Sequence, residues 1–165
     1  MPDSTGPLAP YRVLDLTDRR GLLCGKILAD LGADVVKVEP PDGNAARRVG
    51  PFVQDIEDPE RSLHWWAYGA NCRSLVLDVT TAEGRERLLD LLRAADFLLE
   101  SFPPGHLDRL NLGWATLHRE NPRLILTSIT PFGADGRYRD FKGSDLVLQA
   151  MGGMMHQLGD RDRPP

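Results

Sequence analysis

The chain has 165 residues, of which 41% are hydrophobic and 27% charged, so it is long enough for one globular domain with a substantial core. Its 24 acidic and 20 basic residues give a net charge of −4, which argues against broad nucleic-acid binding, because such proteins present a basic face. No apolar run approaches membrane-spanning length, so we expect no membrane partner.

The N-terminus and the cysteines are both typical of a cytoplasmic protein. Residues 1–6 contain no basic stretch followed by an apolar one, so no signal peptide is visible. Cys24 and Cys72 lie far apart in the sequence and indicate no disulfide framework. A reducing cytoplasm is therefore the expected location.

The most informative stretch is residues 13–39, which predict a strand, a helix and a second strand. The two strands are residues 13–16, which contain Val and Leu, and residues 34–39, which contain three Val. The helix between them covers residues 22–31, where apolar side chains recur at helical spacing: Leu23, Ile27, Leu28 and Leu31. Two short strands joined by one helix are parallel neighbours with a right-handed crossover.

The carboxyl ends of these two strands are the first places to look for a ligand, because ligands of parallel sheets bind there. They are the turn at residues 17–21 and the segment at residues 39–42. A dinucleotide-binding turn needs the pattern G-x-G-x-x-G, whereas this turn has Gly21 alone, so nicotinamide binding is not favoured. Glu39 stands where an acid would bind a ribose, but we expect it to be a strand-end acid that faces solvent.

The middle of the chain continues the alternation. Residues 40–61 predict a long loop, which is followed by a short aromatic helix at residues 62–68 and a third strand at residues 73–78. Thr80 as N-cap and Glu83 form a capping box. The helix that they begin extends to about residue 94, and we expect it to bury Leu88, Leu91, Leu92 and Ala95.

The last third of the chain completes the pattern. The fourth and fifth strands are residues 96–100 and 124–129, and short helices at residues 107–110 and 114–120 lie between them. A glycine-rich loop at residues 130–140 and a final helix at residues 146–151, capped by Ser144 or Asp145, follow. This alternation predicts an α/β fold, a Rossmann-like domain with a mostly parallel sheet flanked by helices.

No metal site or nucleophile follows from the sequence pattern. There is no P-loop, no H-E-x-x-H and no C-x-x-C, and the four histidines show no ligand spacing. Basic residues do gather in loops and at the ends of elements, where they would either bind a phosphate-bearing ligand or form ordinary surface charges. They are Arg19, Arg20, Arg47, Arg48, Arg73, Arg109 and Lys142.

Eight stretches, taken in order, carry a resemblance to a known family. They are residues 13–16, 28–39, 71–78, 95–105, 121–125, 132–133, 145–153 and 164–165. In this order they resemble the family III CoA-transferases of the CaiB/BaiF type, which include formyl-CoA and carnitine-CoA transferases. The similarity covers nearly the whole chain from residue 11.

The resemblance implies an activity and an assembly. Members of the family look like interlocked homodimers with a Rossmann-like domain, and they move CoA between an acyl-CoA and a small carboxylic acid. An aspartate attacks the acyl-CoA and forms a mixed anhydride and then an aspartyl-CoA thioester. Coenzyme A or acyl-CoA is then a substrate, and no permanently bound cofactor or metal is implied.

The resemblance also implies a coenzyme site when it is carried over position by position. The residues are Asp18, Arg19, Arg20, Leu77, Ser101, Phe102, Arg109, Leu110 and Lys142. In this site Phe102 packs on the adenine, whereas Arg109 and Lys142 meet phosphates. Two departures from the family occur: residues 19–22 replace its usual Ala-Gly-Pro, and Ser101 stands where the family often has Asn.

The family resemblance places the nucleophilic aspartate in a Gly-Asp step beyond Pro165, so we assign no catalytic residue. Asp145, Asp160 and Asp162 do not match that step. We therefore expect the chain alone to lack transferase turnover, although the full-length protein is an expected enzyme. Apolar residues near the C-terminus are then expected to be uncovered: Leu146, Val147, Met151, Met154 and Met155.

The expected division of the chain has three parts. Residues 1–10 form a flexible arm, residues 11–158 a Rossmann-like CoA-binding domain, and residues 159–165 an open end or loop that leads to a missing remainder. Two other functions stay open. The chain is alternatively a stand-alone, non-catalytic CoA- or nucleotide-binding or scaffold module, and the disfavoured third possibility is a nicotinamide-dependent enzyme.

Overall fold

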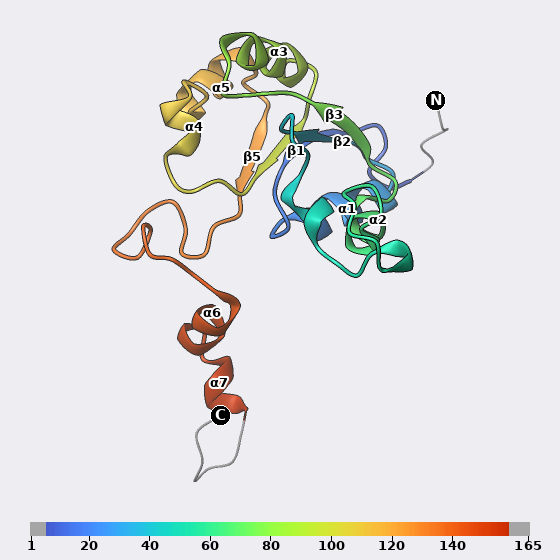
Figure 1. The fold of residues 1–165 in the computed structure, drawn as a ribbon. Coiled ribbons are helices and arrows are strands. Elements are labelled where there is room, and N and C mark those ends of the chain that lie inside the picture. The colour runs from blue at the N-terminus through green and yellow to red at the C-terminus, as the bar shows by residue number, and fades with distance from the viewer. Residues whose placement is uncertain (1–5, 159–165) are drawn as a thin grey trace.

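A five-stranded parallel sheet forms the centre of the computed structural model, which describes residues 6–158 (Figure 1). In chain order the strands are β1 (Arg12–Leu16), β2 (Asp34–Glu39), β3 (Arg73–Val76), β4 (Phe97–Glu100) and β5 (Ile125–Ser128). In space their order is β3-β2-β1-β4-β5, and every pair is parallel. The predicted α/β class with a parallel sheet is confirmed.

Helices cover both faces of the sheet (Figure 1). On one side lie α1 (Leu22–Asp30) and α2 (Leu63–Gly69), and on the other lie α3 (Ala82–Leu92), α4 (His106–Arg109) and α5 (Trp114–Glu120). The loop between β2 and α2 contains two short 3₁₀ turns, η1 (Ala45–Arg48) and η2 (Val53–Asp55). The final helices, α6 (Asp145–Met151) and α7 (Met154–Gln157), extend away from the sheet (Figure 1).

The central strand β1 is buried on both of its faces. Val13 packs with Val35 and the α1 side, whereas Leu14 packs with Leu98 and the helices α3 and α5. Its apolar residues are therefore nearly continuous in sequence, as is typical of a strand in a parallel sheet that has helices on both sides.

One ion pair is buried inside this apolar sheet. Asp15 of β1 and Lys37 of β2 face each other in the strand register, and Lys37 Nζ lies 2.6 Å from Asp15 Oδ2. Their side chains are 0% and 2% exposed. The other carboxylate oxygen of Asp15 accepts hydrogen bonds from the Thr17 amide at 2.8 Å and the Thr17 hydroxyl at 2.6 Å. Both oxygens of the buried carboxylate are thus satisfied.

Helix α1 lies directly over this ion pair, which explains which of its faces is buried. Gly25 and Ala29 face the sheet, and Leu22 packs against Ala46 and Trp65. Of the four periodic apolar residues that predict the helix, Leu28 is half-buried against the core and the other three point outward. Leu23, Ile27 and Leu31 are 54%, 48% and 41% exposed. Small residues occupy the inner face because the helix approaches the sheet closely, so apolar periodicity alone predicts the helix but not its buried side.

Replacing Gly25 by Ala is expected to destabilise the protein by about 1–3 kcal/mol, the usual cost of overpacking. A Cβ atom at this position would overlap Asp15 Oδ2 and lie 2.9 Å from Lys37 Nζ. In the middle of an ordinary helix, a Gly→Ala substitution stabilises the protein by about 1 kcal/mol. Urea unfolding measures the difference, with Lys26→Ala on the same helix as control. An increase in stability of Gly25→Ala would contradict the close packing.

Helix α3 is formed as predicted, with two local differences. Thr81, not Thr80, is its N-cap, and its hydroxyl accepts the Gly84 amide at 3.0 Å. The Thr80 side chain is already used, because its hydroxyl donates to Asp78 Oδ1 at 2.6 Å. Leu88, Leu92 and Ala95 are buried as expected, whereas the predicted burial of Leu91 is wrong because this side chain is 38% exposed and lines a cavity beside the sheet.

The two ends of the described chain differ in their contacts. Residues 6–10, which we expected to belong to a flexible arm, form a turn in which the Leu8 amide donates to Leu31 O at 3.0 Å. At the other end α6 is capped by Ser144, and the predicted apolar residues of α6 and α7 are exposed except for Met155, which is half-buried. The rest of the predicted arm and the predicted open end, residues 159–165, lie outside the described residues.

Candidate functional site

The strand order places a topological switch point between β1 and β4. From β1 the chain proceeds to β2 and β3 on one side, and it then returns to build β4 and β5 on the other. The loops that leave β1 and β4 therefore diverge at their carboxyl ends, where open α/β sheets bind their ligands. Asp18 follows β1 and Ser101 follows β4, so two residues of the predicted site lie at this point.

Asp18, Arg20 and Ser101 connect the two strand ends directly. The Asp18 amide donates to Ser101 Oγ at 2.9 Å, and the Ser101 hydroxyl donates to Asp18 Oδ1 at 3.0 Å. Arg20 Nε donates to the same carboxylate at 2.9 and 3.0 Å, and Arg20 Nη2 donates to Ser101 O. The turn after β1 is thus held by one carboxylate, one guanidinium and one hydroxyl instead of the glycines of a dinucleotide-binding turn.

The protonation of this cluster follows from its hydrogen bonds. Burial by itself raises the pKa of Asp18, but the hydrogen bonds from Arg20 and Ser101 outweigh it and lower the pKa below its ordinary value. The Asp18 carboxylate in turn raises the pKa of Arg20. The turn therefore carries an ionised carboxylate and a charged guanidinium that are already in place before a ligand arrives.

An aromatic pair lies directly after β4. The Phe102 amide donates to Glu100 Oε2 at 2.7 Å, and Glu100 itself is buried at the end of the strand. The Phe102 ring is half-buried and stacks on the His106 ring, with centroids 4.6 Å apart and an interplanar angle of 24°. One face of Phe102 is thus already covered by a second flat ring.

The other predicted site residues lie in different surroundings. Leu77 is buried in the core on the α3 side, and Leu110 is half-buried against the same core, so their side chains do not face an open site. Arg19 and Lys142 are exposed, and neither forms a hydrogen bond or an ion pair with residues 6–158. Arg109 is exposed beside Gly105 at the start of α4.

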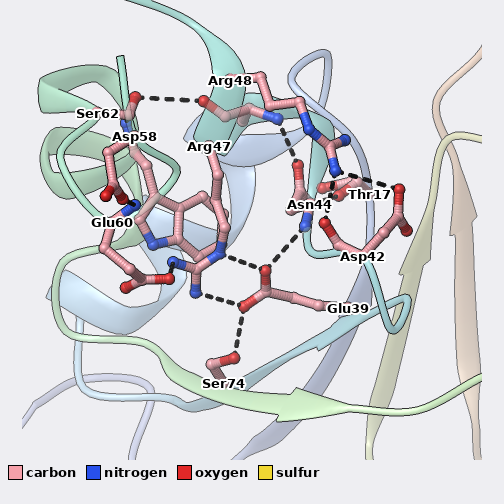
Figure 2. Close-up of polar contacts among 12 residues, drawn as sticks. Thr17, Glu39, Asp42, Asn44, Arg47, Arg48, Asp58, Glu60, Ser62 and Ser74 are labelled. Carbon is pink, nitrogen blue, oxygen red and sulfur yellow. Dashed lines mark hydrogen bonds and ion pairs between the residues drawn. The ribbon is translucent and has the colours of Figure 1, made fainter. Parts of the chain in front are cut away.

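Glu39, which we expected to face solvent, is buried in a polar network (Figure 2). Arg47 reaches it with Nε at 2.6 Å and Nη2 at 2.9 Å, Ser74 donates its hydroxyl, and the Asn44 amide donates at 2.9 Å. The prediction was wrong because the long loop folds back over the end of β2. Arg47 also packs on the Trp65 ring, with its guanidinium 4.2 Å from the ring centroid.

This network removes Arg47 from the candidate phosphate ligands, because its guanidinium is held by Glu39 and by Glu60 at 2.9 Å. Burial by itself raises the pKa of Glu39, but the hydrogen bonds from Arg47, Ser74 and Asn44 outweigh it and lower the pKa to about 2. Asn44 continues the network to the first turn, since its Nδ2 donates to Thr17 O at 2.9 Å.

A cavity of about 750 Å³ lies at the other end of the sheet, near the first residues of β1, β2 and β3. Its polar groups are already paired, because Asp34 lies 2.6 Å from Arg73 and 3.9 Å from Arg12. The carboxyl ends of the strands therefore remain the better candidate site.

Residues 6–158 contain neither a metal-binding cluster nor a membrane-spanning helix. No group of three or more His, Cys, Asp or Glu side chains in this range is placed to hold a metal ion. No helix in the range is long and apolar enough to cross a membrane. Cys24 and Cys72 are free and half-buried, and burial raises the pKa of both thiols, which keeps them protonated and poorly reactive.

Comparison with known proteins identifies the family. The family model described as CoA-transferase family III matches residues 8–165. The chain belongs to this family. It is 41% identical over 155 residues to succinyl-CoA:(R)-benzylsuccinate CoA-transferase subunit BbsE of Thauera aromatica. This match covers 93% of this chain and 38% of that protein. It is also 41% identical over 162 residues to formyl-CoA:oxalate CoA-transferase of Streptomyces avermitilis. This second match covers 98% of this chain and 38% of that protein.

A solved structure of the same group has the same fold. A CaiB/BaiF family protein from Brucella suis superposes with a TM-score of 0.87 at 38% identity, and the match covers 97% of this family III chain and 43% of that protein. The chain thus spans about two fifths of the length of the relatives it matches. The resemblance that the ordered motifs indicated is confirmed.

Two residues beside the candidate site were not predicted from the sequence as site residues. Glu100 was placed only within a strand, and Asn44 was not singled out. Asn44 lies in a loop, where no periodicity indicates which side chain turns inward. Glu100 offered one signal: an acid that ends an otherwise apolar buried strand lies next to the ligand-binding edge.

Proposed function

We propose that this chain is the coenzyme-binding part of a family III CoA-transferase that moves CoA between an acyl-CoA and a small carboxylic acid. The observation that carries the proposal is the Asp18–Arg20–Ser101 cluster at the switch point, with Phe102 and Arg109 beside it. Membership of the family supports the acyl-CoA as the substrate class. Relatives named for succinyl-CoA and formyl-CoA support a carboxylic acid as the second substrate.

The chain's own residues have distinct roles in this proposal. The Asp18–Arg20 turn and Ser101 hold the two strand ends in place, so that a ligand does not have to order them. The exposed Arg19 and Arg109 supply guanidinium groups for phosphates. The Phe102–His106 pair offers an aromatic edge beside them for the adenine.

The chemical step that we propose for the full reaction is the one that the family resemblance implies. A carboxylate attacks the thioester carbonyl and expels the CoA thiolate, which leaves a mixed anhydride. The thiolate then attacks the enzyme's acyl carbon, which releases the donor acid and leaves an enzyme-bound CoA thioester. The acceptor acid then attacks the enzyme-bound CoA thioester, and the same two steps in reverse transfer the CoA to the acceptor and restore the free carboxylate of the enzyme. This chain contributes coenzyme contacts to the scheme, and none of its aspartates is assigned the nucleophilic role.

We extend the proposal to the assembly and the location of the protein. A homodimer of the complete protein would cover the apolar side chains exposed on α1, α6 and α7. Two free cysteines fit a reducing compartment such as the cytoplasm.

Titration calorimetry with CoA and with NAD tests the coenzyme assignment. We expect CoA to bind and NAD not to bind, because the turn after β1 lacks the glycines that admit a dinucleotide. Ser101→Ala removes the hydroxyl that links the two strand ends, so CoA affinity should fall about 5–10-fold, which corresponds to the loss of about one hydrogen bond.

Ser128→Ala is the matched control, because Ser128 is an exposed serine at the end of the neighbouring strand β5. It should bind CoA as the wild type does. Equal affinity of Ser101→Ala and Ser128→Ala for CoA, or tighter binding of NAD than of CoA, would overturn the proposed site.

A further inference from the structure

Two arginine side chains from different parts of the chain converge on one glycine beside the candidate site. Gly105 precedes α4 with a φ of +74°, and a Cβ atom built on it would lie 3.7 Å from Arg109 Nη1 and 3.8 Å from Arg139 Nη2. Arg109 belongs to α4, whereas Arg139 lies in the loop that follows β5. Both guanidinium groups therefore lie beside the same half-buried piece of backbone.

The positive charge at this place is not balanced by the neighbouring acids. Arg109 forms no ion pair within residues 6–158, and Arg139 has a single contact of 3.4 Å to the exposed carboxylate of Asp140. Asp108 is directed to Gly113 instead, where its carboxylate occupies the space a Cβ atom would need. Two like charges this close repel each other, so an anion between them would be strongly favoured.

The shape of the site favours a phosphate as that anion. The missing Cβ of Gly105 leaves open the space between the guanidinium groups, and each group can donate two parallel N–H bonds to phosphate oxygens. Phe102 and His106, which flank Gly105 in sequence, form the stacked aromatic pair. A phosphate next to an aromatic platform matches the phosphorylated nucleotide end of CoA.

We propose that Arg139 and Arg109 form a clamp for a phosphate group of CoA, with Gly105 as its floor. This inference rests on the proposed function and adds a binding residue to it. It assigns to Arg139 the contact that the family resemblance implies for Lys142, a residue without a polar contact to the rest of the described chain. Gly105 itself is accounted for by its φ of +74°, and the absence of a side chain keeps the backbone beneath the two guanidinium groups uncovered.

Isothermal titration of the 165-residue chain at constant ionic strength tests the clamp with three ligands: CoA, inorganic pyrophosphate and pantetheine, which carries no phosphate. For Arg139→Gln and Arg109→Gln we expect the affinity for CoA and pyrophosphate to fall about 10–100-fold, as for other hydrogen bonds to charged groups. Affinity for pantetheine should stay unchanged. Arg139→Lys should recover only part of the loss, because an ammonium group keeps the charge but lacks the planar pair of parallel donors that a guanidinium presents to two phosphate oxygens.

Arg137→Gln is the matched control, since Arg137 lies in the same loop and its guanidinium stacks on Tyr138 at 4.5 Å from the ring centroid. It changes the net charge equally and should bind CoA as the wild type does. Equal CoA affinity of Arg139→Gln and Arg137→Gln would overturn the clamp but leave the proposed function standing. The same would follow if Arg139→Gln lost as much affinity for pantetheine as for CoA. Pyrophosphate binding that depends on Arg139 without any CoA binding sustains the clamp as a phosphate site and overturns the coenzyme assignment. No binding of either ligand overturns both.

Discussion

Replacing Lys37 by Met is expected to destabilise the fold by about 3–5 kcal/mol, because the change leaves the buried carboxylate of Asp15 without its partner. The two side chains are almost completely buried, and their charged atoms are 2.6 Å apart. An uncompensated charge in the sheet costs far more than the lost attraction itself. The free energy of unfolding in urea measures the effect.

A second substitution in the same protein separates charge from packing. In the double variant Lys37→Met/Asp15→Asn, the amide oxygen can still accept the hydrogen bonds of Thr17, and no buried charge remains. It should recover a large part of the lost stability. Lys26→Met, which removes a partly exposed pair with Asp30, should cost less than about 1 kcal/mol. A double variant that is no more stable than Lys37→Met would show that the buried charge is not the cause.

Glu39→Gln is expected to lower the stability at pH 7 by about 2–3 kcal/mol and to remove part of its pH dependence. The pKa of Glu39 is about 2 in the folded protein, against an ordinary value of 4.5. The unfolded chain therefore takes up this proton first as the pH falls. The stabilisation is fully present above pH 4.5 and is lost as the pH falls toward 2. Urea unfolding of wild type and variant at pH 7, 5 and 3 measures this difference, which should shrink at the lowest pH.

Asp42→Asn is the control for this experiment. Asp42 and Arg48 form an ion pair of 3.3 Å in the same loop, but both side chains are more than half exposed. Its loss should change stability by less than about 1 kcal/mol at every pH. A pH-independent difference between Glu39→Gln and wild type would show that the Arg47–Glu39 pair does not stabilise the fold through its charge.

The Asp15–Lys37 pair and the Glu39–Arg47 pair also stabilise the first turn of the candidate site. Asp15 accepts hydrogen bonds from Thr17, and Glu39 holds Asn44, which donates to Thr17 O. The turn that follows Thr17 contains Asp18, whose amide is held from the other strand by Ser101. The first turn is thus fixed from β2 and from β4. Variants of the buried pairs that still fold should bind CoA more weakly, since the turn must then be ordered on binding.

Much of the fold follows from local sequence. The apolar runs of the strands and the helices between them predict a parallel α/β sheet correctly, and Ser144 was predicted as a cap of α6. The structure differs from the sequence-based expectation where two local arrangements are equally possible and tertiary contacts select one of them. Thr81 is the cap because Asp78 already engages Thr80, and α1 turns Gly25 inward because a buried ion pair lies beneath it.

The candidate site was predictable where it lies at strand ends and hidden where loops form it. Asp18 and Ser101 follow β1 and β4 directly, so their meeting is a consequence of strand order. Glu39 and Arg47 both looked exposed, and only the folded loop shows that they neutralise each other. Side-chain partners across a loop depend on the path of the backbone, which no short-range pattern encodes.

The sequence by itself determined the α/β class, the parallel sheet and the family, and it predicted the strand ends at which we propose that a ligand binds. These properties depend on hydrophobic periodicity and on ordered motifs, which are local and additive along the chain. The tertiary structure alone decided which charges are free. Arg47 is held in the buried network, Arg20 is tied to Asp18, and Arg109 meets Arg139 over Gly105. Such contacts depend on the folded path of the backbone, because electrostatic partners and hydrogen-bond partners are set by distance in space and not by separation along the chain.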